Sequence, residues 1–169
     1  MKILVHLVSG QNLPNYIASK IICADKELFL FTKGSLASLK ILENVLPNKL
    51  NPVEIPAWDY LSISNSINKI LDQYKDCELI LNFTGGNKIM SQAAFSLFSN
   101  NRKDCIYINS EKDEYLYFRK TNGNFNVVNK SISVAADLVD YIKLNGQNVE
   151  FEDERISDIQ NKIELNNIF

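Results

Sequence analysis

The sequence has no long hydrophobic run. Within its 169 residues, no apolar stretch approaches the length of a membrane-spanning helix. Met1 and Lys2 lead directly into a short strand-like segment, with no small-residue cleavage site that would mark a signal peptide. We therefore expect a cytoplasmic chain that makes no contact with a membrane.

Histidine and cysteine are also scarce. There is one histidine, His6, and the three cysteines (Cys23, Cys77 and Cys105) are widely spaced and form no CxxC pair. This pattern predicts no metal site, and the odd number of cysteines in apolar surroundings favours buried, reduced thiols over disulfides. His6 interrupts the apolar stretch 3–8 without an evident partner, which favours a core histidine over a catalytic one.

An excess of positive charge is absent as well. Lysine and arginine total 18 against 20 aspartates and glutamates, for a net charge of -2. Such a chain lacks the excess of positive charge that binding of long nucleic acid requires, so any nucleotide partner should be small. The 46% hydrophobic content and the length fit one globular domain, and no internal repeat or low-complexity segment is present.

Strand-like and helix-like segments alternate through residue 100. Short apolar runs predict strands at 3–8, 28–32, 77–83 and 105–108, and helical spacing of apolar residues separates most of them. The proline-rich segment 47–58 allows only a short edge strand at 53–55. Segments 115–119 and 125–128 flank an Asn-Gly turn and predict a hairpin. The fold class is α/β, a Rossmann-like, doubly wound and mostly parallel sheet with a C-terminal antiparallel hairpin.

Polar residues mark the expected helix starts. Asn12, Ser35, Asp59 and Ser133 are candidate N-caps, the last for a helix ending at Leu144. The domain is expected to span residues 1–146, with 147–169 as a tail or linker helix. This acidic, asparagine-rich segment has isoleucines at helical spacing, which leaves open whether it dimerises, links to another domain or is solvated.

The most informative stretch is 79–90, where an apolar strand runs into Thr84-Gly85-Gly86-Asn87 and then into a helix. Two glycines allow a tight turn, and the first N–H groups of the helix lack intrahelical partners. Lys88 adds a positive charge where the helix dipole already favours anions. The stretch predicts a phosphate cradle, and the alternative is an ordinary strand-to-helix turn.

A second polar loop, Ser9-Gly10-Gln11-Asn12, follows the first strand. Carboxyl ends of parallel strands meet at one edge of a sheet, so this loop should lie beside residues 84–88. Asn12 could equally serve only as a helix cap. The dinucleotide fingerprint G-x-G-x-x-G is missing after this strand, which disfavours an ordinary NAD enzyme.

Taken together, these segments resemble the CRISPR-associated Rossmann-fold (CARF) domains of type III CRISPR immunity. The middle segment is similar to the T-G-G-T-K-x-M pattern of that family, with Asn87 where threonine is frequent. The resemblance rests on residues 7–15, 82–91 and 132–146.

The resemblance implies a homodimer that binds a cyclic oligoadenylate across its twofold axis, without a cofactor or metal, and it favours cyclic tetra-adenylate as the ligand. It assigns the phosphates to the backbone of Gly85, Gly86 and Asn87, beside Thr84, and to the Lys88 ammonium. Ribose and base contacts fall to the other loop and its neighbours at the rim, namely Ser9, Gly10, Gln11, Asn12, Lys33 and Ser35.

Three functions remain open at this stage. The first is a sensor that controls an effector, for which residues 147–169 leave no room in this chain. The second is a stand-alone, metal-independent ring nuclease, with Lys88 as the cation and Ser9 as the positioning residue. The third is an unrelated Rossmann-like protein that binds a mononucleotide. We rank the sensor first because no triad or carboxylate pair supports catalysis.

Overall fold

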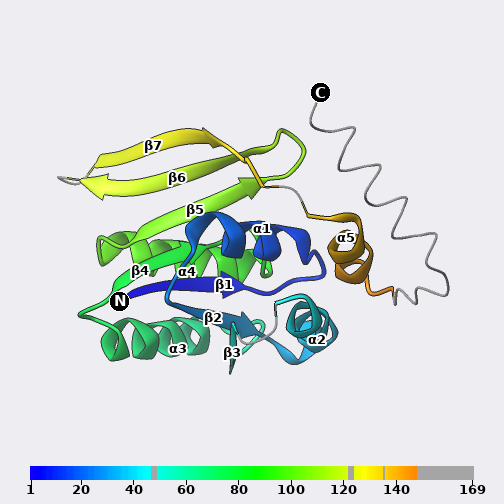
Figure 1. Cartoon of the computed structure of the whole chain (residues 1–169). Helices are drawn as coiled ribbons and strands as arrows, with labels where there is room; N and C mark the ends of the chain where they lie inside the picture. Colours follow the sequence, from blue (N-terminus) through cyan, green and yellow to red (C-terminus); the bar gives the residue numbers. More distant parts are fainter. Residues whose placement is uncertain (47–48, 122–123, 135, 148–169) are drawn as a thin grey trace, which may run out of the picture.

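The computed structural model describes residues 1–46, 49–121, 124–134 and 136–147, so the predictions for the tail lie, from residue 148 on, outside the described residues. Figure 1 shows the strands as a single twisted sheet with helices against it. The elements in chain order are β1 (Lys2–Leu7), α1 (Leu13–Ile22), β2 (Lys26–Phe31), the short 3-10 helix η1 (Lys33–Ser35), α2 (Leu36–Val45), β3 (Leu50–Glu54), α3 (Tyr60–Gln73), β4 (Glu78–Asn82), α4 (Lys88–Asn100), β5 (Asp104–Asn109), β6 (Glu114–Thr121), β7 (Asn124–Ser131) and α5 (Leu138–Leu144).

The sheet has seven strands in the order β3-β2-β1-β4-β5-β6-β7. The first five are parallel, and β6 and β7 form the expected antiparallel hairpin. The chain winds from β1 outward to β3 and then returns to place β4 directly beside β1. This confirms the Rossmann-like, mostly parallel fold predicted from the sequence.

Both faces of β1, β2, β4 and β5 are largely buried, which explains their nearly continuous apolar sequences, whereas the edge strand β3 is mostly exposed. On one face, Ile3, Val5 and Leu81 pack against α3 and α4. On the other face, Leu4, Phe29 and Ile80 pack against α1 and α2. Alternate strand residues therefore serve two separate cores.

The edge strand predicted at 53–55 is longer in the structure and begins earlier. Strand β3 begins at Leu50 and includes Pro52, which lies opposite Phe29 of β2. Proline lacks an N–H group, but β3 is the edge strand and pairs on one side only, so the missing donor breaks no ladder bond with a further strand.

The helix start predicted at Ser133 was wrong. The Ile132 N–H donates to the Asp113 carbonyl at 2.7 Å, which extends the pairing of the hairpin past β7. The helix α5 begins at Leu138, where the Asp137 carboxylate caps it by accepting from the Asp140 N–H at 2.7 Å. The helix ends at Leu144 as predicted, and Gly146, two residues further on, has a φ of +76°.

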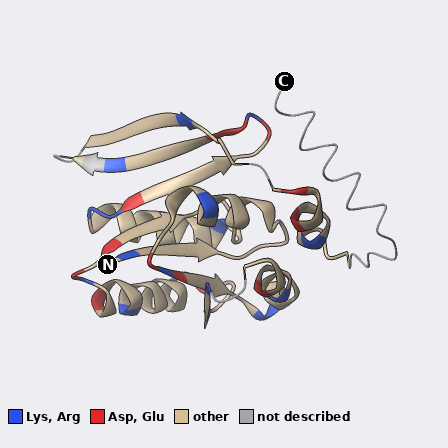
Figure 2. Ribbon diagram, in the orientation of Figure 1, with Lys and Arg blue, Asp and Glu red and all other residues tan. Residues whose placement is uncertain are grey.

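The thiols also differ from expectation. All three are free, but only Cys105 is buried, whereas Cys23 is exposed and Cys77 is half-buried. No helix in the described part of the chain is long and apolar enough to cross a membrane. Charged residues of both signs are interspersed along the ribbon (Figure 2).

Candidate functional site

The loops that follow β1 and β4 lie side by side at the carboxyl edge of the sheet. These two strands are neighbours, with His6 opposite Asn82, and their onward connections lead to opposite halves of the sheet. Such a switch point is where open α/β sheets form a crevice for ligands. The structure thus places residues 9–12 and 84–88 at one edge, as predicted.

The glycine turn packs against the end of β1 more closely than any other residue would allow. A Cβ on Gly85 would lie 2.1 Å from the Leu7 carbonyl oxygen. Gly86 has a φ of +77°, in the left-handed region that favours glycine, and faces the Leu7 side chain. These two glycines are therefore required by close packing and backbone conformation.

The helix α4 starts directly after this turn. Asn87 caps it, because its side-chain oxygen accepts from the Met90 N–H at 2.9 Å. The Asn87 amide nitrogen donates to the Ala57 carbonyl at 2.6 Å and ties the β3–α3 loop to the turn. One N–H and one lone pair of its side-chain amide are thus already used within the fold.

Lys88 is the first residue of α4 and is exposed. Among the described residues, no carboxylate pairs with its ammonium group. It lines a hollow together with Thr84, Gly85 and Gly86, and the aromatic rings of Phe83, Phe95 and Tyr107 form the other side. A mobile cation therefore stands at the positive end of a helix, which suits an anionic ligand.

A buried polar side chain supports the turn from below. Asn82, at the end of β4, is fully buried. Its side-chain oxygen accepts from the Thr84 hydroxyl at 2.8 Å and from the Thr84 N–H at 3.3 Å. The Thr84 hydroxyl oxygen in turn accepts from the Ile108 N–H at 2.8 Å, so the threonine joins β4 to β5. The Thr84 side chain is consequently part of the scaffold.

The polar contacts continue under α1. The Asn82 amide lies 3.3 Å from Nδ1 of His6, and Nε2 of His6 lies 3.2 Å from the Glu27 carboxylate. Burial lowers the pKa of His6, and a neutral ring protonated on Nε2 satisfies both contacts. Burial favours a raised pKa for Glu27, but the bonds from His6 and Ser19 and the nearby Lys49 hold it below its usual value. His6 is therefore a satisfied core histidine, as expected.

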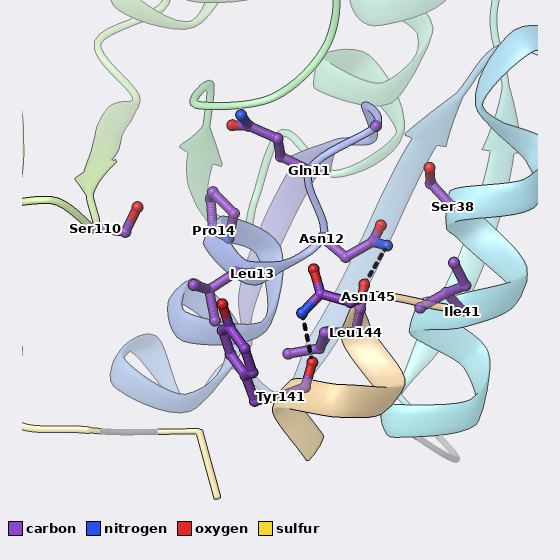
Figure 3. A pocket seen from close by; sticks show the side chains of 11 residues that line it. Gln11, Asn12, Leu13, Pro14, Ser38, Ile41, Ser110, Tyr141, Leu144 and Asn145 are labelled. Carbon is purple, nitrogen blue, oxygen red and sulfur yellow. Dashed lines mark hydrogen bonds between the residues drawn. The ribbon is translucent and has the colours of Figure 1, made fainter. Parts of the chain in front are cut away.

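The loop 9–12 borders a second hollow, between α1, α2 and α5 (Figure 3). Asn12 does not cap α1 with its side chain. Its amide nitrogen instead donates to the Leu144 carbonyl of α5 at 3.0 Å, as the dashed line in Figure 3 shows. Its side-chain oxygen is buried and has no partner in the described part of the chain. The hollow is about 350 Å³ and is lined by Gly10, Gln11, Asn12, Leu13, Pro14, Ser38, Ile41, Ser110, Tyr141, Leu144 and Asn145.

A third hollow lies between these two loops and η1. The Ser35 hydroxyl points back and donates to the Thr32 carbonyl at 3.2 Å, so it does not cap α2 with its side chain. Lys33 lies further out, in an adjoining hollow with Gly34 and Trp58. The third hollow is about 310 Å³ and is lined by Val8, Ser9, Thr32, Gly34, Ser35, Ala57, Trp58, Gly86, Asn87 and Met90.

The predicted residues thus surround the glycine turn, but they line adjacent hollows and do not share one cavity. Sequence reasoning missed two residues here, Asn82 and Trp58. Both had a usable signal, because each stands at or just beyond the carboxyl end of a parallel strand. No group of histidine, cysteine and acidic residues suited to a metal occurs in the described ranges.

Comparison with known protein families gives one decisive match. A model of the Card1 CARF domain matches residues 3–137. The chain belongs to the CARF family. The alternative of an unrelated mononucleotide-binding protein is thereby removed. No curated protein sequence shows a significant match to this CARF domain.

Solved structures resemble the CARF domain over most of its length. Can2 from Sulfobacillus thermosulfidooxidans, in complex with cyclic tetra-adenylate, is 25% identical, with a TM-score of 0.72 over 83% of this chain and 40% of its own. Protein VC1899 from Vibrio cholerae is 14% identical, with a TM-score of 0.75 over 93% of this chain and 42% of its own.

A type III CRISPR defence DNA nuclease activated by cyclic oligoadenylate is 15% identical, with a TM-score of 0.68 over 89% of this chain and 24% of its own. The CARF domain described here therefore spans less than half the length of these proteins.

Proposed function

We propose that this CARF domain binds a cyclic oligoadenylate, with cyclic tetra-adenylate as the first candidate, and acts as a sensor in a type III CRISPR response. The observation that carries the proposal is the Gly85-Gly86 turn at the switch point, followed at the start of α4 by Lys88, which pairs with no carboxylate of the described residues. Family membership and the bound ligand of Can2 support the same ligand class.

In this proposal the phosphates lie against the first turn of α4. The backbone N–H groups there lack helical partners and the Lys88 ammonium supplies charge. Because the Asn87 side chain is bound to Met90 and Ala57, its backbone is the part that we assign to the phosphates. A ligand that lacks phosphate should therefore bind much more weakly.

The bases are assigned to the hollows beside the loop 9–12. The side-chain oxygen of Asn12 is a hydrogen-bond acceptor without a partner among the described residues, and the exocyclic amino group of adenine is a donor. Because this oxygen is buried, the Asn12 side chain must turn toward the hollow to accept from the base. Gln11 is exposed beside it and offers both a donor and an acceptor. These groups favour adenine over a base that presents only acceptors at the same edge.

We further propose a homodimer, because a ring of identical nucleotides has rotational symmetry that a twofold pair of sites matches. Since the domain spans only 24% to 42% of the related chains, the effector that reads out binding is proposed to lie elsewhere in the system or in a longer protein.

The test is calorimetric titration of the purified chain with cyclic tetra-adenylate, without added metal. Lys88→Ala should weaken binding by about 1–3 kcal/mol through loss of a charge-assisted contact. Lys69→Ala is the matched control, because Lys69 is exposed near the far end of α3, away from the lining residues. Equal affinity of the two variants would contradict the phosphate cradle.

Chromatography of the same mixture shows whether the cyclic tetra-adenylate is cleaved. The result expected of a sensor is intact cyclic tetra-adenylate, bound at one molecule per dimer. Conversion to linear products would establish the ring nuclease instead, and then Lys88→Ala and Ser9→Ala should slow cleavage more than they weaken binding. Absence of binding would overturn the assignment of cyclic tetra-adenylate as the ligand.

A further inference from the structure

Trp58 is the most exposed large hydrophobic side chain of the described residues, with 74% of its surface accessible. It is also the only tryptophan in the sequence. Large aromatic rings are usually covered, because burying them contributes strongly to stability or to binding. A ring left open beside a crevice therefore points to a ligand that covers it.

The position of Trp58 is fixed by hydrogen bonds on both sides. The preceding carbonyl, of Ala57, accepts from the Asn87 amide at 2.6 Å. The following residue, Asp59, caps α3 and accepts from the Leu61 N–H at 3.2 Å. Trp58 is thus held between the glycine turn and the start of a 14-residue helix, so its ring is presented by a rigid segment.

The same ring lines the hollow of Ser9, Gly86 and Asn87 described above. One wall of this hollow is the turn assigned to phosphate, and another is the exposed indole. A nucleotide whose phosphate lies on Gly86 would bring its base within reach of an aromatic surface.

We propose that Trp58 is a stacking surface for one adenine of the ligand, and that Asn87 serves to hold it there. The inference rests on the proposed function and deepens it. Stacking of a base on an aromatic ring is tolerant of its hydrogen-bonding pattern. Trp58 therefore contributes affinity, while the loop 9–12 distinguishes adenine from other bases.

This role also accounts for the asparagine at position 87. One amide reaches the Met90 N–H with its oxygen and the Ala57 carbonyl with its nitrogen. The residue that begins α4 thereby sets the distance between the phosphate turn and the stacking ring. Asn87→Ala should release the loop that carries Trp58, even though the Trp58 indole itself is unchanged.

The sole tryptophan makes the test direct, since intrinsic tryptophan fluorescence reports only on Trp58. Titration with cyclic tetra-adenylate should quench this fluorescence with the same midpoint as calorimetry. Trp58→Ala should weaken binding about tenfold to a hundredfold, and Trp58→Phe should retain most of the affinity. Tyr60→Ala is the matched control, because Tyr60 is an exposed aromatic two residues away that does not line the hollow.

The outcomes separate this inference from the proposed function. The stacking role is wrong, and the ligand assignment stands, if cyclic tetra-adenylate binds more weakly to Lys88→Ala but normally to Trp58→Ala, and if the fluorescence of the wild-type chain does not change. If the wild-type chain does not bind cyclic tetra-adenylate, the stacking role and the proposed ligand are both wrong. If Trp58 fluorescence changes on dilution without ligand, and Trp58→Ala alters the oligomeric state, the Trp58 indole is covered by a second copy of the chain. This result also overturns the inference.

Discussion

Replacement of Gly85 by alanine tests whether the glycine turn is held by close packing. The added Cβ would lie 2.1 Å from the Leu7 carbonyl oxygen, about 1.3 Å short of the 3.4 Å at which ordinary contact begins. The obstructing atom is backbone, in a β1 strand that is bonded on both sides. Neither partner can therefore move by a simple side-chain rotation.

The cost follows from what must shift. The Leu7 carbonyl also accepts from the Asn15 amide at 3.3 Å, so its displacement strains a buried polar contact as well. Overpacking of this kind costs about 1–3 kcal/mol, and the additional strain on a hydrogen bond brings the expected loss to about 2–4 kcal/mol. For a chain of this length, this corresponds to a decrease in Tm of roughly 5–15 °C.

Urea denaturation followed by circular dichroism measures the free energy of unfolding. Gly10→Ala is the matched control, because a Cβ at Gly10 meets nothing within 4 Å. That variant should range from unchanged to about 1 kcal/mol more stable, since alanine restricts the unfolded chain. If Gly85→Ala and Gly10→Ala are equally stable, the turn is not packed against β1 as described.

Two further predictions concern the polar contacts beneath the turn. Because burial lowers the pKa of His6, the folded chain keeps its only imidazole neutral while the unfolded chain binds a proton below about pH 6.5. The unfolding free energy should therefore decrease as the pH falls from 7.5 to 5.5, and a flat profile in urea denaturation over that window would contradict the burial of His6. Replacing Asn82 by alanine leaves the Thr84 N–H and hydroxyl without their acceptor, so it should cost about 2–4 kcal/mol of stability and also weaken binding of cyclic tetra-adenylate. Calorimetry and denaturation measure the two effects, and unchanged binding by a folded variant would show that the turn does not depend on Asn82.

The layout of the sheet could be predicted because its determinants are local. Apart from the edge strand β3, each parallel strand is covered on both faces, so its sequence is a short apolar run that stands out from the amphipathic helices. The turn at 84–88 was equally visible, since its glycines follow such a run directly. Family membership confirms that this pattern was diagnostic.

What the sequence could not reveal depends on pairing between distant residues. Ser133 has the side chain of a good cap, but the bond from the Ile132 N–H to the Asp113 carbonyl ties the residue before it to the hairpin, and α5 begins only at Leu138. Pro52 argues against a strand unless that strand is known to lie at the edge.

The side chains of the candidate site show the same limit. Asn12 was a candidate cap, but its amide donates to the Leu144 carbonyl of α5. Asn87 was expected at the phosphates, and its side chain both caps α4 and donates to the Ala57 carbonyl. Local patterns therefore located the crevice, but only the fold shows which polar atoms remain free in it.

The bond between Asn12 and the Leu144 carbonyl has a consequence for biosynthesis. It joins residues 132 positions apart. At the usual rate of translation, Leu144 is made on the order of ten seconds after Asn12. During that interval the Asn12 amide lacks its acceptor, and the hollow beside the loop 9–12 lacks the wall that α5 supplies. A product truncated before residue 138 would therefore have an incomplete pocket beside this loop.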